Sequence, residues 1–282
     1  MKLFLTPSVG HLASLIPGEH GRYKIRKFND GELFLKLEEN VEHQAVTVIT
    51  ATYPPAKHFC ELFFLLDTLR QQHTTIHVIF TYFGYERQDH PKPCVARAAH
   101  IISNCFKQFE LEKITIVHPH SQRLSQLITF ESIVPYELYI PIVKQLGIDT
   151  IVAPDTGAAS SCQELAQRTQ CLLATIEKER IANNQILPLT VNIPSQTKRA
   201  LIFDDLISTG ATITQAVTLL QARGVEEIYA LATHCFLNEL NLQKLLESPV
   251  KHVWVSNSIP SYCTSPQLTV INIVPALEPL LN

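Results

Sequence analysis

The 282-residue sequence has no hydrophobic run long enough to cross a bilayer, no excess of charge of either sign and no closely spaced pair of cysteines. A membrane-spanning helix needs roughly 20 apolar residues, whereas the longest apolar run here covers residues 62–66. The formal net charge of -3 gives no reason to expect a nucleic-acid or membrane partner. Seven cysteines without a C-x-x-C spacing indicate buried thiols in a reducing compartment. We therefore expect a cytoplasmic protein.

The first residues, MKLFLTPSVGHLASLIPG, resemble a secretory signal only faintly. Pro7 and His11 interrupt the apolar run, and no small-residue cleavage site follows it cleanly. We predict instead a β-strand over residues 2–6, followed by a helix.

Hydrophobic residues make up 46% of the chain and charged residues 17%, which is typical of a globular protein. Short β-branched runs alternate with helical stretches, and this alternation predicts an α/β fold with mainly parallel sheets. The predicted strands are 45–51, 76–83, 114–117, 150–153, 172–176, 200–203, 227–232 and 252–255. The predicted helices are 59–71, 95–109, 136–146, 158–168, 211–223 and 238–246. The alternation runs twice, which predicts domains at 1–135 and 136–265 and a tail at 266–282 that forms a strand and a short helix.

The segment LIFDDLISTGATIT, residues 201–214, carries the most chemistry. An apolar strand ends at Asp204 and Asp205, and a short loop leads into a helix. The loop residues are Ser208, Thr209, Gly210, Ala211 and Thr212. Such a loop at a helix N-terminus offers backbone N–H groups to a phosphate, while the acids can bind sugar hydroxyls or Mg²⁺. The alternative is that the acids are turn residues and the hydroxyls only cap the helix, but two adjacent acids after a buried strand are unfavourable unless something binds them.

This segment resembles the phosphoribosyl-binding loop shared by phosphoribosyltransferases and phosphoribosyl pyrophosphate synthetases. The resemblance implies that both domains have a phosphoribosyltransferase-like fold, each a mainly parallel sheet flanked by helices. It implies that Asp204 and Asp205 bind the ribose 2- and 3-hydroxyls and that the loop binds the 5-phosphate. Ala211 stands where a glycine is common, so it would be strained if that position needs a positive φ and harmless if it is already helical.

The first domain contains a segment similar to the adenine-binding F-x-D-x-E of the synthetases, at residues 28–32. The resemblance implies that the Phe28 ring stacks on adenine, that Asp30 and Glu32 accept hydrogen bonds from the base, and that this loop reaches into the site of a neighbouring subunit. For the pentapeptide alone, an ordinary Asp-Gly turn between strands is the alternative.

Residues 82–89, YFGYERQD, resemble the synthetase segment P-Y-x-x-Y-A-R-Q-D, which leads into a mobile catalytic loop. The implied ATP contacts come from Arg87, Gln88 and Asp89. Glu86 replaces the usual alanine, and prolines flank the lysine of segment 91–93 where the family has adjacent basic residues. We therefore expect a stiffer loop than usual; a solvated loop without a catalytic role is the alternative.

Residues 118–120, His-Pro-His, end another predicted strand and are similar to the N-P-H or D-L-H of the synthetases. The resemblance implies that His120 binds the ATP-associated Mg²⁺ or the ATP phosphates. A His-x-His pair could also bind zinc, but no third or fourth ligand is spaced nearby in the sequence.

Two further segments match the synthetases in the second domain. The first resembles the pyrophosphate loop P-D-x-G, with Asp155, Thr156, Gly157 and Ala158; the resemblance implies that Asp155 helps to bind Mg²⁺. The second matches their K-x-R signature, in which Lys178 and Arg180 face the transferring group. A spacing of two on an extended chain puts both cations on one side, although a surface charge run is the alternative.

The six segments occur in the family order, and the sequence is identified as a member of the ribose-phosphate pyrophosphokinases, in their compact archaeal-type form. The resemblance implies an enzyme that transfers the pyrophosphoryl group of ATP to the C1 hydroxyl of ribose 5-phosphate, with Mg²⁺ as cofactor. It implies catalytic roles for Lys178, Arg180 and Arg87, and a homodimer or larger homo-oligomer. A non-catalytic regulatory homologue and a phosphoribosyltransferase are the alternatives.

Overall fold

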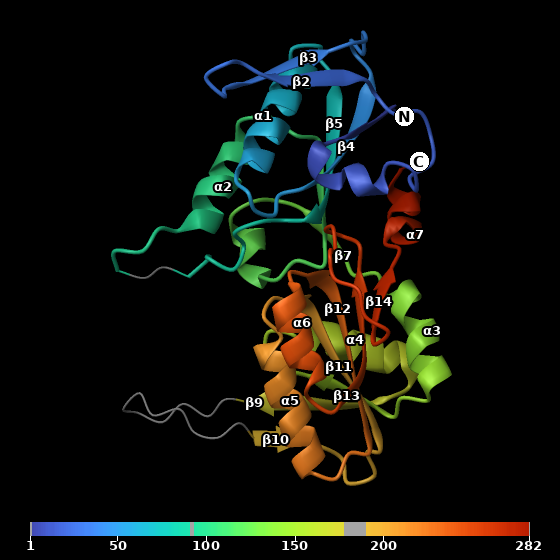
Figure 1. Cartoon of the computed structure of the whole chain (residues 1–282). Helices are drawn as coiled ribbons and strands as arrows, with labels where there is room; N and C mark the ends of the chain where they lie inside the picture. The colour runs from blue at the N-terminus through green and yellow to red at the C-terminus, as the bar shows by residue number, and fades with distance from the viewer. Residues whose placement is uncertain (1, 91–92, 178–189, 282) are drawn as a thin grey trace. The chain divides into compact units, whose positions relative to one another are not determined.

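A computed structural model describes residues 2–90, 93–177 and 190–281. The chain forms two compact units. The first contains Met1–Val134 with Ser258–Pro260 and Val274–Asn282, and the second contains Pro135–Asn257 with Ser261–Ile273. Each unit has its own mainly parallel sheet flanked by helices, which confirms the predicted α/β fold (Figure 1). None of the described helices is long and apolar enough to span a bilayer.

The first unit is built on a five-stranded parallel sheet with the order β1-β4-β5-β6-β7. Its strands are β1 (Lys2–Leu5), β4 (Ala45–Ala51), β5 (Thr75–Tyr82), β6 (Lys113–Val117) and β7 (Glu131–Ile133). The helices α1 (Lys57–Arg70) and α2 (Ala98–Lys107) lie together on one face (Figure 1), where the Phe63 and Phe106 ring centroids are 5.3 Å apart. Leucines at the helical spacing, Leu62, Leu65, Leu66 and Leu69, bury one side of α1 in the core.

A β-hairpin that is not among the predicted strands adds a separate two-stranded sheet to this unit. Its strands, β2 (Tyr23–Lys27) and β3 (Leu33–Leu37), pair antiparallel. Exposed and partly buried residues alternate along each strand, and Leu35 and Leu37 pack against the core beside α1. The five-residue segment 28–32 forms the connection between the two strands.

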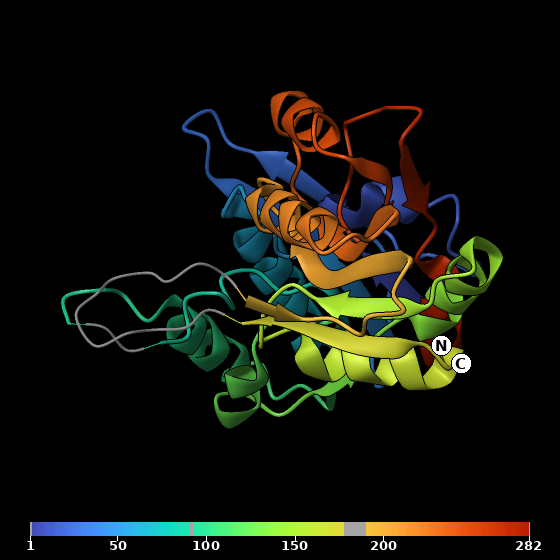
Figure 2. The ribbon, with the colours of Figure 1, turned by 90° about the horizontal axis from the view of Figure 1, so that it is seen from below.

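The second unit is built on a seven-stranded sheet with the order β10-β9-β8-β11-β12-β13-β14. Its strands are β8 (Thr150–Ala153), β9 (Leu172–Glu177), β10 (Thr190–Asn192), β11 (Arg199–Ile207), β12 (Glu227–Cys235), β13 (Val250–Ser256) and β14 (Leu268–Ile271). Only β10, among the described strands of this sheet, pairs antiparallel with its neighbour. Helices α3 (Tyr136–Leu146) and α4 (Ala159–Thr169) cover one face, and α5 (Ala211–Ala222) and α6 (Glu239–Leu246) the other (Figure 2).

The observed ends of β4, β8 and α3 coincide with the predicted ones, whereas β11 is longer than predicted. It continues past residue 203 because β12 runs beside it and pairs Leu206 with His234 and Ile207 with Cys235. Asp204 and Asp205 therefore lie inside the strand instead of after it. The predicted N-terminal strand is β1, and a 3-10 helix at Pro7–Leu12 follows it. In the tail, β14 is followed by a short helix, α7 (Val274–Leu277).

Candidate functional site

Three neighbouring parallel strands of the second unit point their carboxyl ends toward one edge of the sheet. β9, β8 and β11 lie side by side in that order, so the residues after their carboxyl ends share one edge of the sheet. β8 leads into the loop of Asp155, and β11 carries Asp204 and Asp205. β9 ends at Glu177, immediately before Lys178 and Arg180, which lie outside the described residues. Ligands of open α/β sheets bind at this edge.

The acids at this edge are electrostatically strained. Asp204 and Asp205 are partly buried, and the backbone N–H of Asp205 donates to the Asp204 carboxylate at 2.9 Å. Burial raises the pKa of Asp204 well above its usual value, and the charges of Asp205 and Asp155 raise it further. A cation or hydroxyl donor that binds these carboxylates would relieve their repulsion. The arrangement therefore suits a ligand that brings positive charge or hydroxyl groups.

The loop after β11 presents a helix N-terminus. The positive φ of 81° falls on Gly210, whereas Ala211 is the first residue of α5. The substitution of alanine for the glycine common in the family is therefore harmless, because Ala211 is already helical. The N-cap residue, Gly210, has no side chain to cap α5, and the first turn contains no acidic residue. The Thr209 hydroxyl accepts a long hydrogen bond from the Ala211 N–H, at 3.4 Å. Its backbone N–H groups and the helix dipole suit an anion such as a phosphate.

The loop after β8 is organised by Asp155. Its Oδ1 accepts hydrogen bonds from the backbone N–H groups of Gly157 and Ala158, at 2.9 and 3.1 Å. α4 begins at the next residue, Ala159. In this arrangement a carboxylate occupies the N–H groups at a helix start, a position that also suits the oxygens of a pyrophosphate.

In the first unit, the loops after β5 and β6 are joined by two side-chain hydrogen bonds. The Oε2 atom of Glu86 accepts from the backbone N–H of His120 at 2.8 Å, and the Ser121 hydroxyl donates to the Asp89 carboxylate. Burial opposes ionisation of Asp89, but hydrogen bonds from Ser121 and His90 lower its pKa below the usual value. Arg87, Gln88 and His120 have exposed side chains. The structure thus brings the predicted ATP residues 87–89 and 120 to neighbouring loops.

The loop after β5 is anchored at Gly84. A side-chain carbon at this position would lie 2.0 Å from the carbonyl oxygen of Thr52, and the Gly84 N–H donates to the Thr52 hydroxyl at 2.8 Å. Only glycine allows this close approach of the two backbones. This contact between the Gly84 and Thr52 backbones fixes the start of the loop that carries Arg87.

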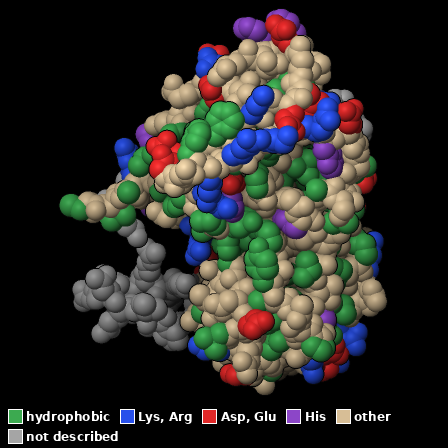
Figure 3. Space-filling model, turned by 45° about the horizontal axis from the view of Figure 1, so that its top comes forward, with side chains coloured by type: hydrophobic (Ala, Val, Ile, Leu, Met, Phe, Trp, Pro, Cys, Tyr) green, Lys and Arg blue, Asp and Glu red, His purple; other side chains and the backbone are tan. Residues whose placement is uncertain are grey.

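The predicted adenine-binding residues occupy the tip of the hairpin. The Phe28 side chain is 56% exposed, and Phe34 lies across from it with ring centroids 5.8 Å apart in an edge-to-face arrangement. Asp30 and Glu32 are exposed, and the Asp30 carboxylate accepts from the Glu32 N–H at 3.0 Å. Figure 3, which brings this end of the unit forward, shows hydrophobic side chains beside Lys and Arg side chains. An exposed aromatic pair can stack on the flat face of a planar base.

Among the described residues, no group of three or more His, Cys, Asp or Glu side chains gathers as a metal site. The zinc alternative for His118 and His120 therefore has no further described ligand. Mg²⁺ differs from zinc, because it is commonly held by one or two carboxylates together with substrate phosphates.

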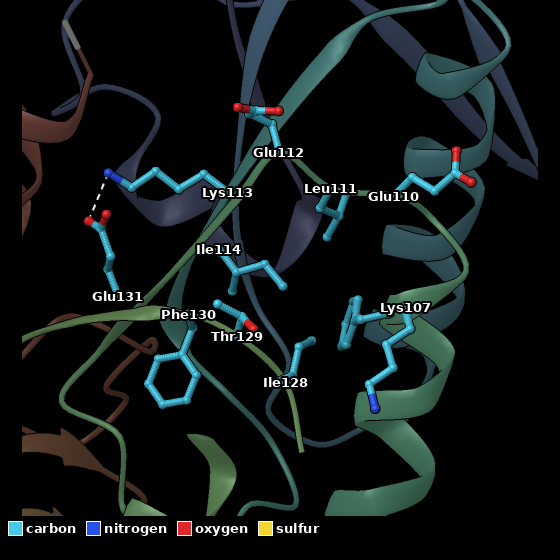
Figure 4. Close-up of a pocket in the computed structure, with 11 residues that line it drawn as sticks. Lys107, Glu110, Leu111, Glu112, Lys113, Ile114, Ile128, Thr129, Phe130 and Glu131 are labelled. Atoms are coloured by element: carbon cyan, nitrogen blue, oxygen red, sulfur yellow. Dashed lines mark ion pairs between the residues drawn. The ribbon is translucent and has the colours of Figure 1, made fainter. Parts of the chain in front are cut away.

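A cavity of about 390 Å³ lies elsewhere in the first unit (Figure 4). It is lined by the end of α2 and the first residues of β6 and β7, where Lys113 and Glu131 form an ion pair at 2.8 Å. These are the amino ends of the strands, opposite to the edge where the loops of Arg87 and His120 begin. None of the lining residues is a predicted site residue.

Comparisons with known proteins place both units in one family. The model described as the N-terminal domain of ribose phosphate pyrophosphokinase matches residues 7–109, and the phosphoribosyl synthetase-associated domain matches 167–276. The ribose-phosphate pyrophosphokinase of Bacillus caldolyticus is 29% identical over 262 residues, covering 88% of this chain and 81% of the relative. The archaeal one of Sulfurisphaera tokodaii is 28% identical over 260 residues, covering 89% and 88%.

Among solved structures, that of the phosphoribosylpyrophosphate synthetase from Mycobacterium smegmatis superposes with a TM-score of 0.87. The superposition covers 99% of this chain and 97% of the Mycobacterium smegmatis chain. At 24% sequence identity, the match shows a similar fold.

We predict that Gly84→Ala lowers the melting temperature by roughly 5 °C or more, because the added carbon collides with a backbone oxygen. Gly10→Ala is the matched control, since nothing lies within 4 Å of its added carbon. Thermal unfolding of both variants measures the difference. Equal melting temperatures would contradict the close approach at Gly84.

We also predict that Asp204→Asn stabilises the ligand-free protein at neutral pH. A raised pKa means that the folded state holds its proton more tightly, so stability falls as pH rises from the ordinary carboxyl range through the raised pKa. The amide removes this loss and keeps an oxygen to accept the Asp205 N–H. We expect a gain of about 2 °C or more that shrinks on acidification, measured by thermal unfolding across pH. Glu226→Gln, at an exposed position of the same unit, is the control; a pH-independent or negative difference would contradict the prediction.

Proposed function

The chain belongs to the ribose-phosphate pyrophosphokinase family, and we propose on this basis that it transfers the pyrophosphoryl group of ATP to the C1 hydroxyl of ribose 5-phosphate, giving 5-phosphoribosyl 1-pyrophosphate and AMP. The observation that carries the proposal is the edge of the second sheet. There the carboxyl ends of β8, β9 and β11 share one edge, and the acids on β11 precede a helix N-terminus with no acidic residue in its first turn.

Ribose 5-phosphate is the ligand that we assign to this edge. Asp204 and Asp205 accept hydrogen bonds from the ribose hydroxyls, which are the donors that a pair of crowded carboxylates favours. Ser208, Thr209 and the N–H groups at Gly210, Ala211 and Thr212 bind the 5-phosphate at the start of α5. Binding the two ends of the sugar phosphate fixes the orientation of the C1 hydroxyl.

The ATP residues that we assign lie in the first unit. The Phe28 ring stacks on adenine, and Asp30 and Glu32 accept hydrogen bonds from its amino group. Arg87, Gln88, Asp89 and His120 bind ATP from the loops after β5 and β6, and Arg87 and His120 meet its phosphates. The exposure of Phe28 at a hairpin tip supports a homodimer or larger assembly, in which the tip completes the site of a neighbouring subunit.

Mg²⁺ fits the donors that the described residues offer. Crowded carboxylates and an exposed imidazole are compatible with a hard cation that arrives with a polyphosphate. We assign its protein contacts to His120 and Asp155; when bound, the ion neutralises charge on the phosphoryl oxygens. The N–H groups of Gly157 and Ala158 hold the Asp155 carboxylate at the start of α4, where it would meet the ion.

The transfer itself depends on positioning and on neutralising charge. The C1 oxygen attacks the β-phosphorus of ATP, the bond from that phosphorus to the α,β-bridging oxygen breaks, AMP leaves, and the hydroxyl proton passes to solvent. Arg87, with Lys178 and Arg180 directly after β9, stabilises negative charge on the transferring group.

The experiment is an incubation of the purified protein with ATP, Mg²⁺ and ribose 5-phosphate, in which AMP and phosphoribosyl pyrophosphate are followed together. We expect equal amounts of both products and no reaction in EDTA. A folded protein that binds ribose 5-phosphate but forms no AMP would contradict the proposal and favour a regulatory homologue. Consumption of phosphoribosyl pyrophosphate with a free base, with release of pyrophosphate, would favour a transferase.

We predict that Lys178→Ala lowers kcat by roughly a hundredfold or more and changes the affinity for ribose 5-phosphate little, because its charge acts on the transferring group. Lys198→Ala is the control, since Lys198 is an exposed lysine that pairs with Glu226 at 3.9 Å. Steady-state kinetics and equilibrium binding separate the two effects. A normal kcat with weakened binding would assign Lys178 to substrate binding instead.

A further inference from the structure

Glu86 is a buried acid that the proposed reaction does not use. Its residue is 1% exposed, and its Oε2 atom accepts the backbone N–H of His120 at 2.8 Å. A buried carboxylate is strongly unfavourable unless hydrogen bonds compensate for its loss of water. This contact crosses from the loop after β5 to the loop after β6, 34 residues further along the chain.

A second contact joins the same two loops. The Ser121 hydroxyl donates to the Asp89 carboxylate, and the Ser121 oxygen accepts from the N–H of Arg123 at 3.1 Å. Residues 86 and 89 on one loop are thus tied to residues 120 and 121 on the other. Since β5 and β6 are hydrogen-bonded neighbours, the two ties continue the pairing of the strands beyond their ends.

The ties hold the backbone at His120 while its side chain is exposed. On the preceding side, His118 has a positive φ of 40° and its N–H donates to the carbonyl oxygen of Ile133 at 2.7 Å. The chain from 118 to 121 is therefore held at both ends, which fixes the point and direction from which the His120 side chain leaves the backbone. Arg87 directly follows Glu86 and is also exposed.

We propose that Glu86 is a positioning residue for the nucleotide: its carboxylate couples the loop of Arg87 to the loop of His120, so that both side chains meet the ATP phosphates in a fixed relation. The inference depends on the proposed function, which assigns Arg87 and His120 to ATP. Glu86 itself touches neither substrate nor metal in this scheme. Its effect is on the geometry of two groups that do.

The test compares two substitutions of similar size. Glu86→Gln keeps an oxygen that can accept the His120 N–H, whereas Glu86→Met fills the same space without a good acceptor. We expect Glu86→Met to lower kcat/KM for ATP by about tenfold or more, with the KM for ribose 5-phosphate changed less than about twofold. Glu86→Gln should stay within about threefold of the wild type for both substrates.

Glu61→Met is the matched control for the loss of a buried glutamate, since Glu61 on α1 is 5% exposed in the same unit. Glu61→Met should lower the stability of the protein without a selective loss of kcat/KM for ATP. A double-mutant cycle with His120→Ala then separates positioning from general destabilisation. In the His120→Ala background, Glu86→Met should lower kcat/KM for ATP by only about threefold or less.

Three results would overturn the inference while the wild type is active. These are an unchanged kcat/KM for ATP in Glu86→Met, equal losses for both substrates, and full additivity with His120→Ala. If Glu86→Met does not fold, a Glu86→Gln variant as impaired toward ATP as His120→Ala would also overturn it, because the acceptor is then present. If the wild type forms no AMP, the proposed function itself is contradicted. The three results above concern only the role of Glu86, because they require an active wild type.

Discussion

Parallel pairing of neighbouring strands is the constraint from which the candidate site follows. Parallel strands end at the same edge of a sheet, so residues far apart in sequence gather there without any other contact between them. In the second unit this pairing brings Asp155 and Asp204 close enough for their charges to interact. In the first unit it brings the loop of Glu86 to that of His120. In either sheet, a strand displaced from its register would move these residues apart.

The two units stabilise the acids at these edges in different ways. In the first, hydrogen bonds from Ser121 and His90 lower the pKa of Asp89, so this charge is already compensated within the protein. In the second, burial and neighbouring carboxylates raise the pKa of Asp204, so compensation is left for a ligand. The charge of Asp89 is thus compensated within the protein, whereas the carboxyl of Asp204 favours a bound cation or hydroxyl donor.

The sequence predicts most of the architecture because strand and helix periodicities are strong where elements are buried, as in β4, β8 and α3. It does not predict β2 and β3, whose five-residue strands are only half buried, or the extension of β11, which depends on pairing with β12. Motifs single out Asp155, Asp204 and His120 as candidate site residues. They do not reveal the role of Glu86, which stands out in sequence only as a departure from alanine, because its contact with His120 arises from tertiary folding.

The most direct measurement of the central claim is a crystal structure of the protein with ribose 5-phosphate. We expect the 5-phosphate at the N–H groups where α5 begins and the ribose hydroxyls on Asp204 and Asp205, with the C1 hydroxyl directed away from the helix and free to attack ATP. A sugar phosphate bound elsewhere, or bound with its C1 hydroxyl turned toward the helix N-terminus, would contradict it.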